Sequence, residues 1–295
     1  RGHGHFLSFN GEVKELFAEI LGKSIGPSKG IGGSQHINKG HFFSSGVQGA
    51  HIPVALGVAK SLKEEQRGAV SVAIFGDGTL GSGILWESLN ISSIWKLPTI
   101  FICEDNGIAQ STPTSQIFSG DLRKRVEGFG LSYTFVDTTT INDNFKLISD
   151  VIGKSKDLSI PAFIHLKTRR INPHSKGDDN RDSEFLRMLK HDLVSEFFEN
   201  PKWKEFIETK KYELENICDE LLKLTETDYS LKDRLKFVSP KVYEKKSSLT
   251  YGITRNKIFT LLNETFRVGV GVGVGVGPNP NPNPNPNPNP NPIKV

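Results

Sequence analysis

The stretch VSVAIFGDGTLGSGILWESLN, from Val70 to Asn90, decides the fold. Its opening is rich in β-branched and aromatic residues and predicts a strand over 70–75. Three glycines follow within six residues, which is typical of a tight turn, and the segment from about 83 to 95 predicts a helix. A strand, a glycine-rich turn and a helix in this order indicate a unit of an α/β protein.

Further apolar segments repeat this alternation along the chain. Strands are predicted within 97–106, 131–140 and 161–170, and helices within 12–23, 53–62 and 206–224. In the last helix one apolar side is predicted, made of Phe206, Leu214, Ile217, Cys218, Leu221 and Leu224. We therefore expect an α/β fold, a doubly wound parallel sheet flanked by helices. Ligands of such sheets bind beyond the carboxyl ends of the strands, where the turns at Gly76 and Asn106 lie.

Composition excludes several classes of function. The 295 residues are 36% apolar and carry a net charge of +4, which is too weak to indicate a nucleic-acid partner. The basic run 123–125 is therefore interpreted as a solvated surface. No apolar run approaches about 18 residues, so no membrane span is expected. Cys103 and Cys218 are expected to be buried, reduced thiols of a cytoplasmic protein, or of the mitochondrial matrix if the source is eukaryotic.

The C-terminal part changes character. We expect a main domain over 1–225, an extension or linker over 226–267 that includes a helix at 255–266, and a low-complexity tail over 268–295. The tail alternates Val-Gly and then Pro-Asn, so it is interpreted as a linker, a tail or an artefact. Because the chain opens at Arg1 without a methionine, we expect that a segment can precede it.

The turn GDGTLG at 76–81 allows two interpretations. It fits the glycine fingerprint of dinucleotide binding, with Glu104 or Asp105 as the acid on the ribose. However, the Asp77 carboxylate would repel a pyrophosphate. A divalent cation between the carboxylate and a diphosphate makes the interaction attractive.

The second interpretation assigns a Mg²⁺ site. Asp77 would be one ligand, the side chain of Asn106 a second and the main-chain carbonyl of Ile108 a third, because Mg²⁺ prefers oxygen ligands. The flanking Gly76 and Gly78 would let backbone N–H groups meet the phosphate at a helix N-terminus. The competing structural interpretation is a helix-capping Asp and a turn Asn.

The spacing of thirty positions between GDG and Asn106 resembles the motif for thiamine diphosphate. The wider sequence resembles the alpha subunit of the decarboxylating component of 2-oxoacid dehydrogenases, a family acting on pyruvate, branched-chain 2-oxoacids or acetoin. The resemblance covers about 1–224 and is carried by the blocks RGHGHFL, GPSKGIGGSQH, GVQGAHIPVALGVA, the metal motif and TRRINPHSKGDDNR. It implies a thiamine diphosphate-binding fold with Mg²⁺ on Asp77, Asn106 and Ile108.

The resemblance also implies the other cofactor contacts. Gly78 and Thr79 would offer N–H groups to the diphosphate, and Arg1 would contact the terminal phosphate. Gly46, Val47 and Gln48 would hold the aminopyrimidine ring. The chain departs from the family at three positions: Ile108 replaces a frequent aromatic residue, Gln48 an apolar residue and His51 a Gln. The last two departures bear on the shape of the pocket.

Two histidines match positions of acid–base chemistry in the family. His3 follows Arg1, and His174 lies in a loop that resembles one closing over the active site, where it would also contact the cofactor. Ser175 matches a position that is phosphorylated in mitochondrial members, although a plain loop hydroxyl is the favoured interpretation. Arg170 and Arg181 are expected to order this loop against Asp178 or Asp179. The remaining candidates, His5, His36 and His41, are interpreted as structural.

The implied activity is oxidative decarboxylation of a 2-oxoacid with acyl transfer to a lipoyl carrier on an acyltransferase component. The glutamate that activates the cofactor comes from a beta subunit in this family, so we expect a separate or fused beta partner, in an alpha2beta2 assembly or a dimer of fused chains. Segment 247–266 faintly resembles the start of a beta region, and 104–116 favours the branched-chain type. The alternatives are a transketolase-like enzyme and a non-catalytic scaffold subunit.

Overall fold

The computed structural model describes residues 2–10, 12–138, 141–174 and 197–224, and positions 179, 181, 182, 184 and 186. The chain divides into two units, Arg1–Ser230 and Leu231–Val295, and all described residues belong to the first. The predicted helix at 255–266 and the repetitive tail lie outside the described residues. The predicted boundaries at 225 and 267 stay predictions.

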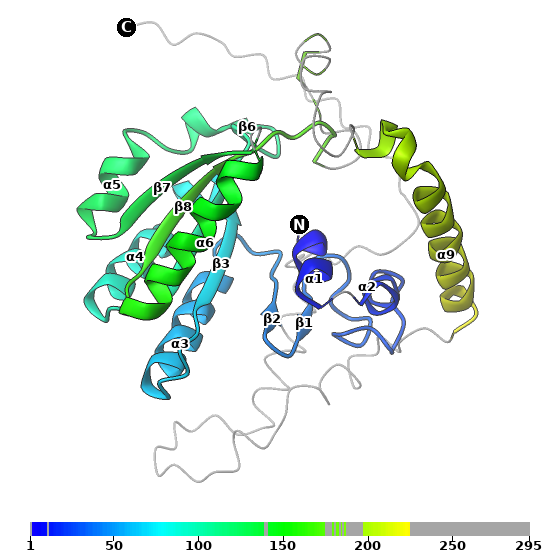
Figure 1. Ribbon diagram of the computed structural model, residues 1–295, viewed down its shortest axis with the longest axis horizontal. Helices are drawn as coiled ribbons and strands as arrows, with labels where there is room; N and C mark the ends of the chain where they lie inside the picture. Colours follow the sequence, from blue (N-terminus) through cyan, green and yellow to red (C-terminus); the bar gives the residue numbers. More distant parts are fainter. Residues whose placement is uncertain are drawn as a thin grey trace, which may run out of the picture. The chain divides into compact units, whose positions relative to one another are not determined.

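Four parallel strands form a sheet among the helices within 51–158 (Figure 1). Its spatial order is β3-β4-β8-β7, with bounds Ser71–Gly76, Thr99–Asp105, Ala162–Lys167 and Ser132–Asp137. Each strand was predicted from its run of apolar residues. The order was not, because β8 comes last in the sequence and pairs with β4 on one side and β7 on the other.

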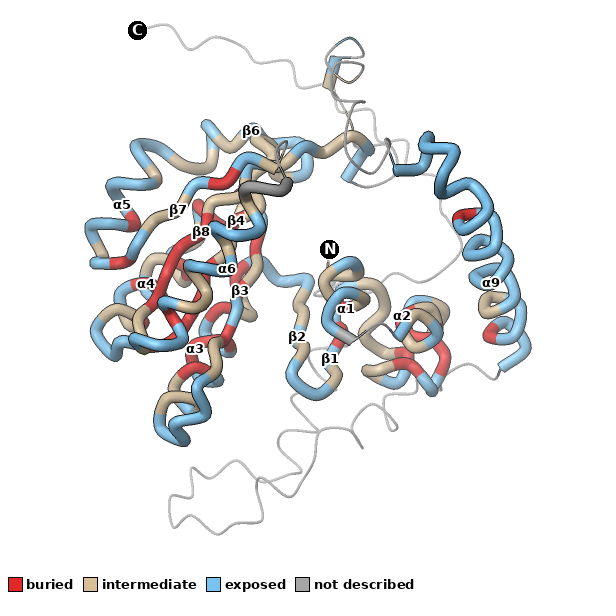
Figure 2. The backbone as a smooth tube through the Cα atoms, viewed as in Figure 1, coloured by how far each residue is buried: buried red, intermediate tan, exposed pale blue. Residues whose placement is uncertain are grey.

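Helices cover both faces of the sheet, which confirms the doubly wound α/β prediction. One face packs on α3 (His51–Glu64), α4 (Gly83–Ile94) and α5 (Leu122–Gly128), and its core includes the fully buried Phe101 and Phe163. The other face packs on α6 (Ile141–Leu158) around Ile100 and Ile164. Figure 2 shows the buried residues following the strands and the inner sides of α3 and α4. The apolar runs of the strands reflect this burial from two sides.

The N-terminal elements are short. They comprise α1 (His3–Asn10), α2 (Val13–Ile20) and a hairpin of β1 (Asn38–Lys39) and β2 (Phe42–Phe43). The predicted helix of 12–23 is confirmed, and Gly22, at a φ of 69°, follows its end. Glu19 of α2 is fully buried and accepts N–H groups from Ser28, Gly30 and Gly32. The Glu19 carboxylate thereby supplies hydrogen-bond acceptors for three backbone N–H groups of the glycine-rich loop.

A second hairpin and three short 3₁₀ helices lie between or beyond these elements. The hairpin, β5 (Ile108–Ala109) with β6 (Thr112–Pro113), follows β4. Short 3₁₀ helices occur as η1 (Asp77–Gly81), η2 (Thr114–Gln116) and η3 (Pro201–Trp203). No helix of the described residues is long and apolar enough to cross a bilayer.

Helix α9 (Lys204–Leu222) packs against α2 by a narrower side than predicted. Ile207 and Leu221, close to four turns apart, are buried, whereas Phe206 is 50% exposed, so its predicted place in the packed side is wrong. The end of α9 is fixed by Lys23, whose ammonium group donates to the carbonyl of Leu224 at 2.9 Å. Because the contact is narrow, Cys218 is only half-buried and its expected burial is also wrong. Both Cys103 and Cys218 are free thiols, and Cys103 is buried as expected.

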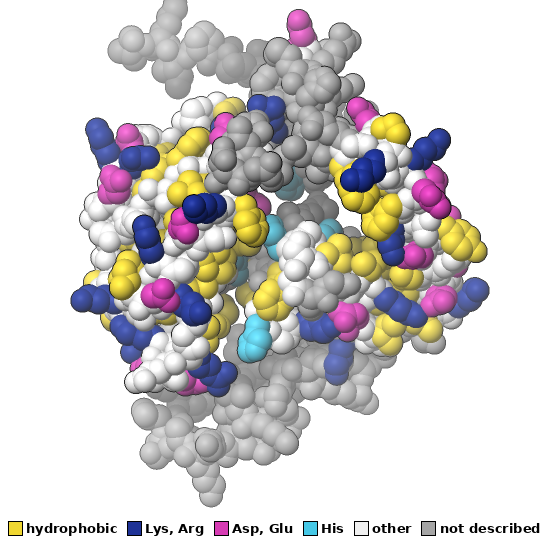
Figure 3. All heavy atoms as spheres, viewed as in Figure 1, with side chains coloured by type: hydrophobic (Ala, Val, Ile, Leu, Met, Phe, Trp, Pro, Cys, Tyr) yellow, Lys and Arg dark blue, Asp and Glu magenta, His cyan; other side chains and the backbone are white. Residues whose placement is uncertain are grey.

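The basic run 123–125 is exposed, as predicted. The guanidinium of Arg125 lies 4.4 Å from the ring centre of Phe118 and 5.0 Å from that of Trp86, which gives it a packing role. On the face drawn in Figure 3, basic and acidic side chains are interspersed. That distribution is unlike a continuous phosphate-binding surface.

Candidate functional site

The predicted cofactor residues gather at the carboxyl ends of β3 and β4. These strands pair in register up to Gly76 and Glu104, so the turn that begins at Asp77 lies beside the turn that begins at Asn106. A third segment, 46–48, approaches them, because Gln48 lies against Gly78. The structure thus brings together three stretches that are far apart in the sequence.

Gly78 is closely framed by two of these stretches. A Cβ atom on it would lie 2.9 Å from the Cβ of Ala109 and 2.9 Å from Nε2 of Gln48. Beside it opens a cleft of about 430 Å³, lined by Gln48, Gly78, Gly81, Ser82, Ala109, Gln110, Ser111, Thr112 and Ile117. Gly78 therefore lines a polar cleft without a side chain, as close approach of backbone to a phosphate requires.

Asp77 is a buried carboxylate, only 2% exposed. It accepts hydrogen bonds from the hydroxyl of Thr114 and from the N–H of Gly78, the latter at 3.1 Å. Burial raises the pKa of Asp77, and the nearby negative charge of Asp105 adds to that rise. Among the described residues, no Lys or Arg forms an ion pair with it. An ionised carboxylate in these surroundings is suited to a bound cation.

The turn after β4 presents two further oxygen atoms. The side-chain oxygen of Asn106 accepts the N–H of Ile108 at 3.2 Å, and the carbonyl of Ile108 accepts from Arg170 at 3.4 Å. Each oxygen has a second lone pair. Gly107, at a φ of 83°, lets the chain turn between them.

These donors suit a hard divalent cation. One carboxylate, one amide oxygen and one main-chain carbonyl form an oxygen-only set, as Mg²⁺ prefers when phosphate oxygens complete its coordination. No cluster of three or more His, Cys, Asp or Glu capable of binding a metal occurs in the described part of the chain. The predicted set contains only one such residue, so it would not form a cluster of that kind. The assignment stays a prediction.

Other predicted site residues have different surroundings. Gly46, Val47 and Gln48 are exposed, with Val47 63% exposed. The buried Nε2 of His51 has no hydrogen-bond partner among the residues that the structure describes. Burial lowers the pKa of His51. Thr79 is buried within η1, and Gly76 closes β3. Arg1, Ser175 and Asp178 lie outside the described residues.

The two predicted acid–base histidines lie in different settings. Nε2 of His3 contacts the carbonyl of Ser34 at 2.7 Å, which fixes that nitrogen as the donor. His174 is exposed. His5, interpreted as structural, contacts the carboxylate of Glu104 at 2.9 Å and so lies at the carboxyl end of β4.

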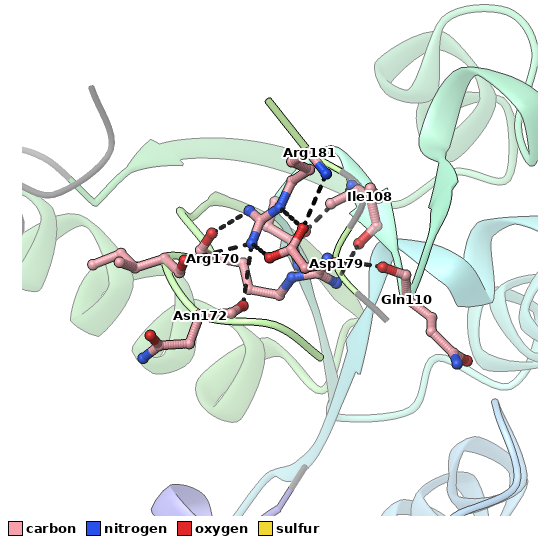
Figure 4. Close-up of polar contacts among 8 residues, drawn as sticks. Ile108, Gln110, Arg170, Asn172, Asp179 and Arg181 are labelled. Atoms are coloured by element: carbon pink, nitrogen blue, oxygen red, sulfur yellow. Dashed lines mark hydrogen bonds and ion pairs between the residues drawn. The ribbon is translucent and has the colours of Figure 1, made fainter. Parts of the chain in front are cut away.

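Arg170 and Arg181 link the segment after β8 to the turn after β4 (Figure 4). Arg181 pairs with Asp179 at 2.6 Å, and its guanidinium also donates to carbonyls of Arg170, Ile171 and Asn172. Hydrogen bonds from Arg181 lower the pKa of Asp179 to about 2. Arg170 instead donates to the carbonyls of Ile108 and Gln110. The expected pairing with Asp179 therefore occurs through Arg181.

Sequence reasoning missed two features of this edge. Thr114, which bonds Asp77, lies thirty-seven positions away in a turn without any motif. Asp105 was considered only as a ribose-binding acid, yet it bonds His165, and this hydrogen bond lowers the pKa of Asp105 to about 2. The sequence signal for this hydrogen bond was His165, a histidine within an apolar strand. Its partner can be identified only when β8 is known to lie beside β4.

Comparisons with known proteins agree with the motif assignment. A family model described as "Dehydrogenase E1 component" matches residues 1–195. The alpha subunit of acetoin:2,6-dichlorophenolindophenol oxidoreductase from Bacillus subtilis is 33% identical over 182 residues, which are 60% of this chain and 55% of the relative.

Two relatives named as pyruvate dehydrogenase subunits have similar sequence identity and coverage. The E1 component subunit alpha of Zymomonas mobilis is 33% identical over 61% of this chain and 52% of its own length. The mitochondrial subunit alpha of Dictyostelium discoideum is 40% identical over 60% of this chain and 47% of its own. The chain thus spans about half the length of the curated relatives that it matches.

Proposed function

Since the chain belongs to the dehydrogenase E1 component family, as an alpha subunit, we propose that it binds thiamine diphosphate through Mg²⁺ for decarboxylation of a 2-oxoacid. The observation that supports this most is the buried Asp77 carboxylate beside Gly78, whose backbone faces a polar cleft. A buried carboxylate that pairs with no Lys or Arg of the described residues, next to a glycine that lines a polar cleft, suits a metal–diphosphate pair.

Each predicted residue has a task in this proposal. Asp77, Asn106 and the carbonyl of Ile108 would hold Mg²⁺, while the N–H groups of Gly78 and Thr79 would meet the diphosphate. Gly46, Val47 and Gln48 would border the aminopyrimidine ring, with Gly76 allowing the chain to turn. Arg1 would contact the terminal phosphate.

Thiamine diphosphate, when bound, supplies the nucleophilic carbon and the electron sink that let CO₂ leave a 2-oxoacid. The protein would bind, orient and exclude water. His174 would exchange protons with the substrate oxygen, and His3 would do so through Nδ1, because its Nε2 is engaged by Ser34. The acyl group would pass to a lipoyl carrier.

The chain would supply only part of an active site. Its relatives are named as alpha subunits, so we propose a beta subunit or fused beta domain as partner, in an alpha2beta2 assembly or a dimer of fused chains. A lipoyl acyltransferase would be the second partner. Acetoin, pyruvate and branched-chain 2-oxoacids are the candidate substrates, with the branched-chain type favoured by 104–116. Cytoplasmic or matrix location stays a prediction, and so does the interpretation of Ser175 as a plain loop hydroxyl.

The test is calorimetric titration of thiamine diphosphate into the chain assembled with its beta partner, with Mg²⁺ and then with EDTA. We expect binding that requires Mg²⁺ and that Asp77→Ala abolishes. Asp150→Ala, an exposed acid on α6, is the matched control and should bind normally. Binding of NAD instead would restore the dinucleotide interpretation. If no thiamine diphosphate binds, the hypothesis that remains is a non-catalytic scaffold subunit.

A further inference from the structure

Three polar side chains form a row across three neighbouring strands. The hydroxyl of Tyr133 in β7 lies 2.6 Å from Nδ1 of His165 in β8, and Nε2 of His165 lies 2.8 Å from Oδ2 of Asp105 in β4. The side chains of His165 and Asp105 are 13% and 14% exposed. The row therefore crosses the sheet laterally and ends at the turn after β4.

The partners define where the protons lie. A carboxylate accepts hydrogen bonds, so Nε2 of His165 carries the proton that it donates to Asp105. In the tautomer with its one proton on Nε2, Nδ1 accepts the hydrogen bond of the Tyr133 hydroxyl. Every polar atom of the row finds a partner.

Asp105 connects this row to the backbone of the turn. Its other oxygen, Oδ1, accepts the N–H of Gly107 at 2.8 Å, and its carbonyl accepts the N–H of Thr168. Lys167 adds a cation 3.7 Å from Oδ2. With both carboxylate oxygens engaged, the turn that follows through Asn106 to Ile108 has a fixed starting direction.

Apolar residues pack against part of the row, while the guanidinium of Arg123 lies 5.0 Å from the ring centre of Tyr133. The ring of Tyr133 stacks on Phe163 with centroids 6.0 Å apart, and Cys103 beside His165 is fully buried. Phe and Leu would fill these positions without the cost of burying polar groups. The residues of the row thus differ from Phe and Leu in their hydrogen bonds rather than in how they pack.

We propose that Tyr133, His165 and Asp105 form a positioning relay that directs Asn106 and the Ile108 carbonyl toward the metal. The inference rests on the proposed function. None of the three residues is assigned to touch the metal or cofactor, so they act through the turn that Asp105 anchors.

Three variants separate hydrogen bonding from packing. Tyr133→Phe removes one hydroxyl, His165→Gln keeps an amide donor for Asp105, and His165→Leu removes both bonds while retaining bulk. The matched controls are Tyr212→Phe, at a side chain 67% exposed on α9, and His41→Gln, at an exposed position.

The first readout is the Mg²⁺ affinity of the assembled chain with thiamine diphosphate, measured by calorimetry. We expect Tyr133→Phe and His165→Gln to weaken it about 5- to 10-fold, and His165→Leu by about 30-fold or more, as one and two hydrogen bonds are lost. The controls should equal the wild type. A packing role predicts that His165→Leu binds as well as His165→Gln, and that result would overturn the relay.

The second readout does not use the cofactor. Imidazole ¹⁵N resonances of His165 in the free protein should report a proton on Nε2, and Tyr133→Phe should shift the Nδ1 signal. If that shift occurs and Mg²⁺ affinity is unchanged, the relay fails while the proposed function stands. If the wild type binds no Mg²⁺ with thiamine diphosphate beside its partner, the proposed function fails and the relay's task fails with it.

Discussion

At the scale of single residues, Gly78 occupies a position where a side chain does not fit. A Cβ atom would approach both Ala109 and Gln48 to 2.9 Å, so Gly78→Ala must displace one of them into the cleft. We expect thiamine diphosphate affinity to fall about tenfold, measured by calorimetry. Gly83→Ala is the control, because its added methyl group would have no neighbour within 4 Å among the described residues outside its own helix. Equal losses in both variants would contradict this account.

We expect Asp77 to lower the free energy of unfolding, although it serves the proposed binding of the metal. Burial raises its pKa above that of the unfolded chain, so the ionised form destabilises the fold at pH above the raised value, and protonation removes this cost. Without metal, we expect Asp77→Asn to raise the free energy of unfolding by about 1 kcal/mol at neutral pH. The difference should shrink as pH falls through the raised pKa. Urea unfolding over a pH series measures it, and a less stable Asn variant at neutral pH would refute the argument.

At the scale of elements, α9 packs against α2 through a narrow side. Leu221 is fully buried and its neighbour Leu222 is 61% exposed, which gives a matched pair on the same helix. We expect Leu221→Ala to lower the free energy of unfolding by about 2–4 kcal/mol and Leu222→Ala by less than about 0.5 kcal/mol. Urea denaturation compares them. Similar values would mean that α9 contributes no packed side to the described unit.

The same scale shows what a pattern of residues can predict. Apolar runs located all four strands of the sheet, because burial from both sides leaves a strong signal. They could not place β8 between β4 and β7, since that pairing joins distant segments. The relay of Tyr133, His165 and Asp105 was missed for this reason. In α9 the periodicity correctly placed Leu221 in the packed side. It missed the buried Ile207 and wrongly included three exposed residues, Phe206, Leu214 and Leu224.

At the scale of the whole molecule, the order of the sequence motifs predicted the family, whereas composition served only to exclude classes of function. The blocks from RGHGHFL to TRRINPHSKGDDNR lie within 1–195, the range that the family model matches. They predicted the family, and the fold then gathered Asp77, Gly78 and Gln48 at one edge. The choice among acetoin, pyruvate and branched-chain 2-oxoacids stays a prediction, and so do the beta partner and the lipoyl acyltransferase.

The insertion of β8 between β4 and β7 also has a consequence for biosynthesis. A ribosome releases β3, β4 and β7 before β8, so a nascent chain that stops near residue 160 holds two sheet fragments with no strand to join them. Long-range parallel pairing of this kind is slow, and unpaired edges invite aggregation. The anchor of Asp105 on His165 likewise forms only after that last strand emerges. Chaperone demand should therefore peak during a short window of translation, before the final strand is synthesised.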